Sequence, residues 1–210
     1  MAEFLEKYGA DLGIAILQHI GYVLVSVGIA IVVALVLAGA LSRIRRAAAV
    51  ILPVISIFQT IPGIVFIGLL MFRFGMTKLT VILALSVYAV FPILKNAYQG
   101  LVEVDPDMIE VAKGCGMNGK QIFFRVELPL AMPAVFAGIR MSLIYTVSWA
   151  ILAAMIGQGG LGEFIYRGID ANVKEYIVIG SIPIAVLAIV FRIVVDRLEK
   201  VIVSKGIQRD

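Results

Sequence analysis

Residues 12–42 contain no Asp, Glu, Lys or Arg, which sharply narrows the possible folds. A helix needs only about 20 apolar residues to cross a bilayer, so this stretch is long enough to do so with residues to spare. The pattern recurs along the chain, which is 61% hydrophobic and only 15% charged, with a mean hydropathy of +1.04. Soluble domains have about half apolar and about a quarter charged residues. We therefore predict an all-α protein that crosses a membrane several times.

The charged residues divide the chain into about five predicted transmembrane helices. Their approximate bounds are residues 14–41, 48–72, 79–100, 132–156 and 176–197. The third contains a lysine, but a lysine near a helix end can extend its ammonium group to the interface. The sequence shows no convincing internal repeat and no appended soluble region, so residues 1–210 are predicted to form a single transmembrane domain.

Five spans would place the two termini on opposite sides of the membrane. One side would hold the turn after the first span, a long polar loop and the C-terminal tail, whose basic residues are Arg43, Arg45, Arg46, Lys95, Lys113, Lys120, Arg125, Arg197, Lys200, Lys205 and Arg209. The other side would hold only Lys7, Arg73, Lys78, Arg167 and Lys174. Because cytoplasmic loops carry the excess of lysine and arginine, we predict the N-terminus outside and the C-terminus in the cytoplasm.

The longest polar interval, residues 103–129, carries its own signals for helix ends. Asp105 is a good N-cap, and Pro106 suits the first helical turn, where a missing N–H costs nothing. Gly114 and Gly116 are expected to stop this helix, because glycine readily adopts the left-handed conformation that follows many helices. The interval therefore begins with one short predicted helix.

A second short helix is predicted directly after the glycines. Asn118 would be its N-cap, and Gln121 stands three residues later, which is the spacing of a capping box. We expect Leu128-Pro129 to end this helix. The interval is thus predicted to be two short helices joined by a glycine elbow at the membrane surface, on the cytoplasmic side.

This interval resembles the EAA loop of ATP-binding-cassette (ABC) importer permeases. The family pattern is E-A-A, three residues, G, nine residues, I-x-L-P, and here Glu110, Ala112 and Gly116 are followed by VELP at 126–129. Val111 replaces the first alanine and Val126 the isoleucine. The resemblance implies a coupling helix that docks on a cytoplasmic ATPase, with the residues Glu110, Ala112, Gly114, Gly116, Leu128 and Pro129. The alternative is an ordinary surface hairpin whose glycines serve only as caps.

Further segments resemble permeases of the osmoprotectant branch of this family. They are FQTIP at 58–62, YAVFPILKNAYQGL at 88–101, AGIR at 137–140 and GQGGLGEFIYRGI at 157–169. The resemblance implies import of small quaternary amines such as glycine betaine, choline or carnitine, delivered by a separate binding protein. Relatives that move other solutes share similar segments, so another small solute, such as an amino acid, stays open.

Polar and aromatic residues inside the spans are candidates for the solute path or its gate. Pro62 and Pro92 interrupt predicted helices, which a membrane tolerates where the freed carbonyl groups face protein or water; simple packing kinks are the alternative. Tyr145 and Trp149 share a helix face and could meet a quaternary ammonium group through cation–π contact, or only pack together. Arg140 must face a cavity or find a partner, as a gate or as a structural anchor. The candidate set is Gln59, Thr60, Pro62, Tyr88, Asn96, Arg140, Tyr145 and Trp149.

The glycine-rich connection at residues 157–162 permits a re-entrant or tightly folded outer loop, although a plain flexible connection is the alternative. Its candidate contacts with a docked binding protein are Gly157, Gly159, Gly160 and Gly162. His19, near the outer end of the first span, is interpreted as an interfacial residue and not as a ligand.

The sequence is predicted to be a transport subunit and not an enzyme. It contains no G-x-x-x-x-G-K-[ST] P-loop, so ATP and Mg²⁺ would act on a partner ATPase, and no cofactor or metal is expected on this chain. An intramembrane enzyme is disfavoured because HExxH and paired intramembrane aspartates are missing. An ion-coupled secondary carrier, a less favoured alternative, usually needs inverted repeats and midplane ionisable groups.

The expected partners follow from the same resemblance and from the size of the bundle. Five spans are too few to enclose a path alone, so a second permease chain, identical or paralogous, is expected. The others are cytoplasmic ABC ATPase subunits, a separate extracellular or periplasmic solute-binding protein and membrane lipid, with no nucleic acid. The expected location is the cytoplasmic membrane of a prokaryote.

Overall fold

The computed structural model describes the backbone of residues 2–203 and the side chains of residues 8–203. All regular structure within this part of the chain is helical. In order, the elements are α1 (Ala2–Arg43), α2 (Arg45–Phe58), α3 (Gly63–Phe74), α4 (Lys78–Val102), α5 (Pro106–Gly114), α6 (Gly119–Ile122), a π-helical turn (Phe123–Glu127), α7 (Leu128–Trp149), a 3₁₀ segment (Ala150–Ile156), α8 (Gly162–Asp170) and α9 (Lys174–Ile202).

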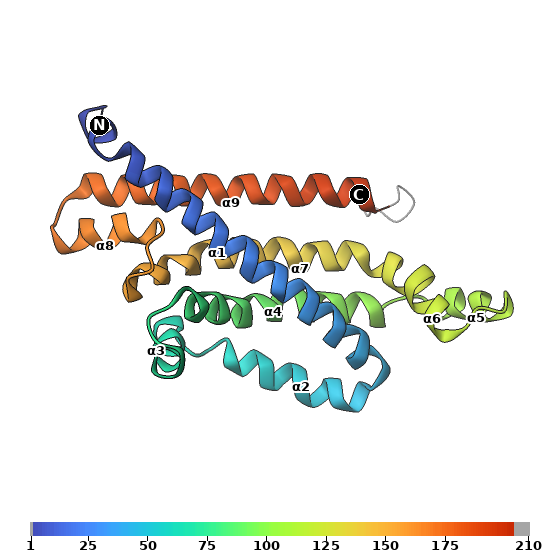
Figure 1. Cartoon of the computed structure of the whole chain (residues 1–210). Helices are drawn as coiled ribbons and strands as arrows, with labels where there is room; N and C mark the ends of the chain where they lie inside the picture. Colours follow the sequence, from blue (N-terminus) through green and yellow to red (C-terminus); the bar gives the residue numbers. More distant parts are fainter. Residues whose placement is uncertain (1, 204–210) are drawn as a thin grey trace.

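Four helical stretches of the described chain are long and apolar enough to cross a membrane, and a fifth crossing is possible for a bent pair of helices. The four are Tyr8–Arg43, Lys78–Val102, Gly119–Ile156 and Lys174–Ile202. The bent pair is α2 with α3. The predicted all-α class with about five spans is therefore confirmed. Figure 1 shows α5 and α6 projecting beyond the bundle at the end where α9 finishes, with α3 and α8 at the opposite end.

The predicted span 48–72 is divided into α2 and α3, which meet at an angle of 93°. Proline has no N–H and disfavours the α conformation in the residue before it. Pro62 accordingly lies between the two helices in an extended conformation, with φ −58° and ψ 132°. Just before it, Thr60 and Ile61 donate to carbonyl groups only three residues back, which closes α2 with a tight turn. The span is a broken helix.

Pro92, by contrast, leaves α4 continuous. Its missing N–H frees the carbonyl of Tyr88 four residues earlier, and the side-chain amide of Gln59 donates to that carbonyl at 3.2 Å. In return, the Tyr88 hydroxyl donates to the carbonyl of Ile61 in the break, at 2.6 Å. The two proline sites thus satisfy each other's unpaired backbone groups, as irregular backbone inside a membrane requires.

The core of the bundle is formed where α1 and α7 pack against α4. Small residues allow this packing, since Ala30, Ala34 and Ala38 recur every four residues on the buried face of α1. Between α4 and α7 the backbones approach closely at Gly138, where a Cβ atom would lie 2.9 Å from the Cα of Ile93. A side chain at this position would force the two helices apart.

Between the predicted spans 132–156 and 176–197 lies a helix that was not predicted from the sequence. This helix, α8, packs against α9 and closes a small second core in which Leu161 and Phe164 are buried beside Ala15 and Ile179. The apolar residues 161, 164 and 165, with a small glycine at 168, have helical spacing, which is the signal that could have predicted it.

The interpretation of His19 as an interfacial residue is wrong. Its side chain is fully buried, and its Nε2 atom lies 2.9 Å from the carbonyl oxygen of Val147 on α7. The 3₁₀ segment begins three residues after Val147, so the regular α-helical bonding of α7 ends here. The imidazole therefore ties α1 to the end of α7.

Candidate coupling loop and solute path

Both helices of the projecting loop begin where the sequence indicates. The Asp105 carboxylate accepts the N–H of Asp107 at 2.9 Å, with Pro106 in the first turn of α5. At α6, Asn118 and Gln121 form both bonds of the predicted capping box, at 2.9 and 3.0 Å. The local capping chemistry of the sequence is enough to set these two helix starts.

Between α5 and α6 the chain reverses at Gly116, which has a φ of +78°. Its N–H bonds to the carbonyl of Lys113, and the next N–H, of Met117, bonds to the carbonyl of Ala112 at 3.1 Å. This paired closure satisfies the last carbonyl groups of α5 and needs a left-handed residue, which glycine supplies without strain. The predicted glycine elbow is therefore present.

The prediction that Leu128-Pro129 ends the second helix is wrong. α6 passes into the π-helical turn and then without a break into α7, with Pro129 in its first turn. In the π turn the Leu128 N–H bonds to the carbonyl of Phe123, five residues back. Pro129 therefore does not stop the helix, and the dipeptide joins two helical segments.

The residues that the resemblance implies for the coupling loop differ in their exposure to solvent. Glu110, Gly114 and Gly116 lie on the surface, whereas Ala112 is buried within the loop and Leu128 is half-buried. The apolar side chains that α5 presents outward are Met108 and Val111, which are 48% and 64% exposed. The loop thus offers a small apolar face beside a carboxylate.

An ion pair between a buried glutamate and a half-exposed arginine joins this loop to α1, and sequence reasoning missed it. Glu127 is only 5% exposed, and both its carboxylate oxygens accept from Arg43, one of them at 2.9 Å. The Arg43 guanidinium also lies 5.5 Å from the centre of the Phe123 ring. Glu127 is the only acidic residue between Glu110 and Glu163, a signal that could have drawn attention to it.

Four of the candidate path residues come together at the broken span. Gln59, Tyr88, Tyr145 and Trp149 line a cavity of about 240 Å³, with Leu85 and Thr146 completing the lining. The Tyr88 and Trp149 rings stack with centroids 4.2 Å apart. Tyr145 is 49% exposed, so one aromatic ring has a free face. Thr60 and Pro62 lie in the adjacent break, where the Thr60 hydroxyl donates to the carbonyl of Ile57 at 2.7 Å.

Asn96 and Arg140 do not line this cavity. Asn96 donates to the carbonyl of Pro92, one turn earlier on its own helix, at 2.8 Å. Arg140 on α7 forms ion pairs with two acids of α9, at 2.6 Å to Asp196 and 2.5 Å to Glu199. An intramembrane arginine is costly without such partners, and here it fastens α7 to α9.

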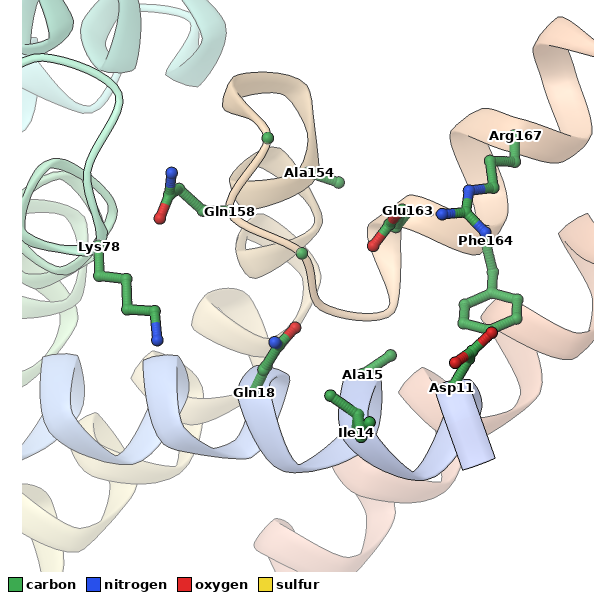
Figure 2. A pocket seen from close by; sticks show the side chains of 12 residues that line it. Asp11, Ile14, Ala15, Gln18, Lys78, Ala154, Gln158, Glu163, Phe164 and Arg167 are labelled. Atoms are coloured by element: carbon green, nitrogen blue, oxygen red, sulfur yellow. Dashed lines mark hydrogen bonds and ion pairs between the residues drawn. The ribbon is translucent and has the colours of Figure 1, made fainter. Parts of the chain in front are cut away.

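The glycine-rich connection is tightly folded and anchored on its neighbours. Gln18 of α1 accepts the Gly160 N–H at 2.9 Å, and the Tyr22 hydroxyl donates to the carbonyl of Gln158 at 2.8 Å. The Gln158 side chain donates to the carbonyl of Met76, before α4, at 2.7 Å. A pocket of about 470 Å³ lies beside this loop. Figure 2 shows residues that line it, among them Gln18, Gln158 and the charged Lys78, Glu163, Arg167 and Asp11.

The bundle, its broken second span and the projecting loop define a membrane permease of the ABC-importer class. Residues 20–206 match the family described as binding-protein-dependent transport system inner membrane component, and the chain belongs to this family. It is a permease subunit located in a membrane and not an enzyme, and the ATPase is a separate chain. Family membership also implies ATPase and permease partners.

Curated relatives cover nearly the whole chain. It is 38% identical over 208 residues to the glycine betaine/carnitine/choline transport system permease protein OpuCB of Bacillus subtilis, covering 99% of this chain and 96% of that one. It is 37% identical to the choline transport system permease protein OpuBB of the same organism, covering 100% and 96%. The osmoprotectant import permease protein OsmW of Salmonella typhimurium is 32% identical, covering 91% of each chain. The resemblance to the osmoprotectant branch is confirmed.

A solved structure shares the fold. The inward-facing MetNI methionine ABC transporter superposes with a TM-score of 0.79 at 20% identity, covering 95% of this chain and 99% of that one. This similarity confirms that the helical arrangement is that of an ABC importer permease.

Proposed function

We propose that the chain forms the solute path of an ABC importer for small quaternary amines such as glycine betaine, choline or carnitine. This proposal rests mainly on the cavity at the broken span, which is lined by Gln59, Tyr88, Tyr145 and Trp149. The printed names of relatives at 37–38% identity, which include these three solutes, agree with its chemistry.

The cavity suits a quaternary ammonium group that must bind weakly and move on. Aromatic faces attract such a cation by about 0.5–2 kcal/mol, depending on desolvation. None of the described residues that line the cavity is a carboxylate, so no tight ion pair would hold a cation there. The Gln59 amide and the Tyr88 hydroxyl are engaged with backbone carbonyls, which fixes the shape of the cavity. Selectivity would then reside mainly in the separate binding protein.

In this proposal the projecting loop couples the path to the ATPase. Met108 and Val111 of α5 supply the docking face, Glu110 lies beside them, and the buried Ala112 holds the loop together. ATP and Mg²⁺ would act on the ATPase. A second permease chain, identical or paralogous, would complete the path, and the outer loop at 157–162 would receive the binding protein through Gly157, Gly159, Gly160 or Gly162. Arg140 and Asn96 would stabilise the helices that border the path.

The solute assignment is tested by reconstituting the purified complex with its ATPase and binding protein in vesicles. We expect saturable, ATP-dependent uptake of radiolabelled glycine betaine, choline or carnitine. Uptake confined to amino acids or inorganic anions would reject the solute class while leaving the permease class intact.

Replacing Trp149 with alanine should slow this uptake more than it changes the apparent affinity. The substitution removes the ring that stacks on Tyr88, and a lost cation–π contact of about 1 kcal/mol corresponds to about a fivefold lower maximal rate. Trp149→Phe keeps an aromatic face and serves as the control. Equal slowing by both variants would argue that the indole is needed for packing and not for its ring face.

The proposed orientation places the N-terminus outside and the loop 103–129 in the cytoplasm. Cys115, the only cysteine of the chain, is exposed in that loop and should react with an impermeant thiol reagent only after cells are permeabilised. In a Cys115→Ser background, a cysteine in place of the exposed Ala171, after α8, should react in intact cells. The reverse labelling pattern would overturn the charge-based orientation.

A further inference from the structure

An apolar groove runs between α1, α4, α7 and the segment that joins α6 to α7. Its volume is about 540 Å³, and its wall consists almost entirely of aliphatic and aromatic side chains, with Val36, Phe123, Phe124 and Leu128 among them. Val36 is 67% and Phe124 64% exposed, so the groove opens on the outside of the bundle. It is distinct from the aromatic cavity at the broken span, which shares none of its lining residues.

The groove lies at the ends of the candidate membrane spans. Its walls belong to the spans Tyr8–Arg43, Lys78–Val102 and Gly119–Ile156, and it reaches the end of the first span and the start of the third. Apolar surface exposed to water costs about 25 cal/mol per Å², whereas lipid chains cover it without that cost. An acyl chain is therefore the expected occupant of the groove, packed against its apolar wall.

The two charged residues that line the groove, Arg43 and Lys120, are both basic. Arg43 is largely neutralised by Glu127, although half of its side chain remains exposed. Lys120 is exposed and has no ion-pair partner within the described chain. None of the described lining residues is acidic, so the groove has no group to receive a lipid's own ammonium.

From this charge complementarity we propose that the groove binds one anionic phospholipid. The acyl chain lies along Val36, Phe123 and Leu128, and the phosphate sits between the Lys120 ammonium and the exposed edge of Arg43. Basic pockets between membrane helices at a bilayer surface favour anionic head groups in this way. The bound lipid touches both α1 and the segment that follows the proposed coupling loop. The proposal rests on the membrane placement of the chain and not on its solute.

The test uses the full chain, with any subunits that co-purify, in nanodiscs that contain acyl-chain spin-labelled phosphatidylglycerol or phosphatidylcholine. The immobilised lipid fraction is measured by electron paramagnetic resonance. We expect phosphatidylglycerol to be preferred about fivefold, because one lysine near the surface contributes about 1 kcal/mol. Lys120→Gln should remove most of this preference. Lys113→Gln, an exposed lysine of α5 that does not line the groove, should leave it unchanged.

A second pair of variants tests the groove itself. Val36→Trp fills the groove and should reduce the immobilised fraction of the labelled phosphatidylglycerol. Val32→Trp, one turn away on the same helix and similarly exposed at 63%, should not. The proposal is overturned by equal immobilisation of the two lipids, by equal effects of Lys120→Gln and Lys113→Gln, or by an unchanged signal in Val36→Trp. It is also overturned if neither lipid is immobilised, which is the result expected when a protein surface covers the groove. The lipid test does not use the solute. A complex that fails to take up quaternary amines can therefore still show the predicted lipid preference.

Discussion

Arg43→Ala is expected to destabilise the transporter and to uncouple ATP hydrolysis from transport. The substitution leaves the Glu127 carboxylate buried at 5% exposure without its partner. Breaking a fully buried ion pair costs about 3–5 kcal/mol. Since about half of the Arg43 side chain is exposed and solvent screens the pair, we expect a smaller cost, about 2 kcal/mol. Thermal unfolding of the purified complex, and the ratio of solute moved to ATP hydrolysed, are the measurements.

Two further variants separate the ion pair from a general loss of stability. The exchanged pair Arg43→Glu with Glu127→Arg keeps both charges and should recover part of the coupling ratio. Arg45→Ala removes an exposed arginine two residues away that has no ion pair in the described structure, and it should behave like the unmodified protein. If Arg43→Ala lowers thermal stability but leaves the ratio of transport to hydrolysis unchanged, the pair has no part in coupling.

The parts of this molecule that the sequence predicts well are those with local causes. The Asp105 cap, the capping box of Asn118 with Gln121 and the left-handed Gly116 each depend on residues within a few positions of one another. Hydrophobic length likewise locates the main spans, because the bilayer imposes the same minimum on every helix. Such features require no knowledge of tertiary contacts.

Predictions from the sequence fail where one local signal is compatible with two different structures. Proline after leucine at 128–129 predicts a helix stop, but a proline also fits the first turn of a following helix, and here a π turn precedes it and the helix continues. Pro62 breaks its span whereas Pro92 does not, and at each site a side chain from the other, Tyr88 or Gln59, donates to a free backbone carbonyl. Sequence spacing cannot reveal that exchange.

Long-range polar pairs were the least predictable part of the candidate sites. Arg43 and Glu127 are 84 residues apart, and Arg140 is 59 residues from Glu199. Its position near a span end suggests the interface for His19, yet the side chain is fully buried, with its Nε2 atom 2.9 Å from the carbonyl oxygen of Val147. An unpaired charge buried in a membrane is costly, so an arginine or acid inside a span signals a partner even when the partner is unknown.

Gly116→Leu is expected to uncouple the ATPase from transport while leaving the spans inserted. Gly116 has a φ of +78°, a conformation that costs an ordinary residue about 1–2 kcal/mol. A leucine would relax toward negative φ and break the closure between α5 and α6, in which Met117 bonds to Ala112. That closure fixes the direction of α5, so the proposed docking face would be misplaced. ATPase co-purification and the ratio of transport to hydrolysis measure the effect.

Two matched variants separate backbone strain from simple bulk at this surface. Gly114→Leu adds the same side chain two residues away, where the described structure leaves open space and the backbone has no positive φ, so coupling should largely survive. Gly116→Asn should also retain more coupling than Gly116→Leu, because asparagine tolerates the left-handed region better than leucine does. If Gly114→Leu uncouples as strongly as Gly116→Leu, close approach of the ATPase and not the elbow conformation is what the glycines provide. If Gly116→Leu couples normally, the elbow does not transmit the motion of the ATPase.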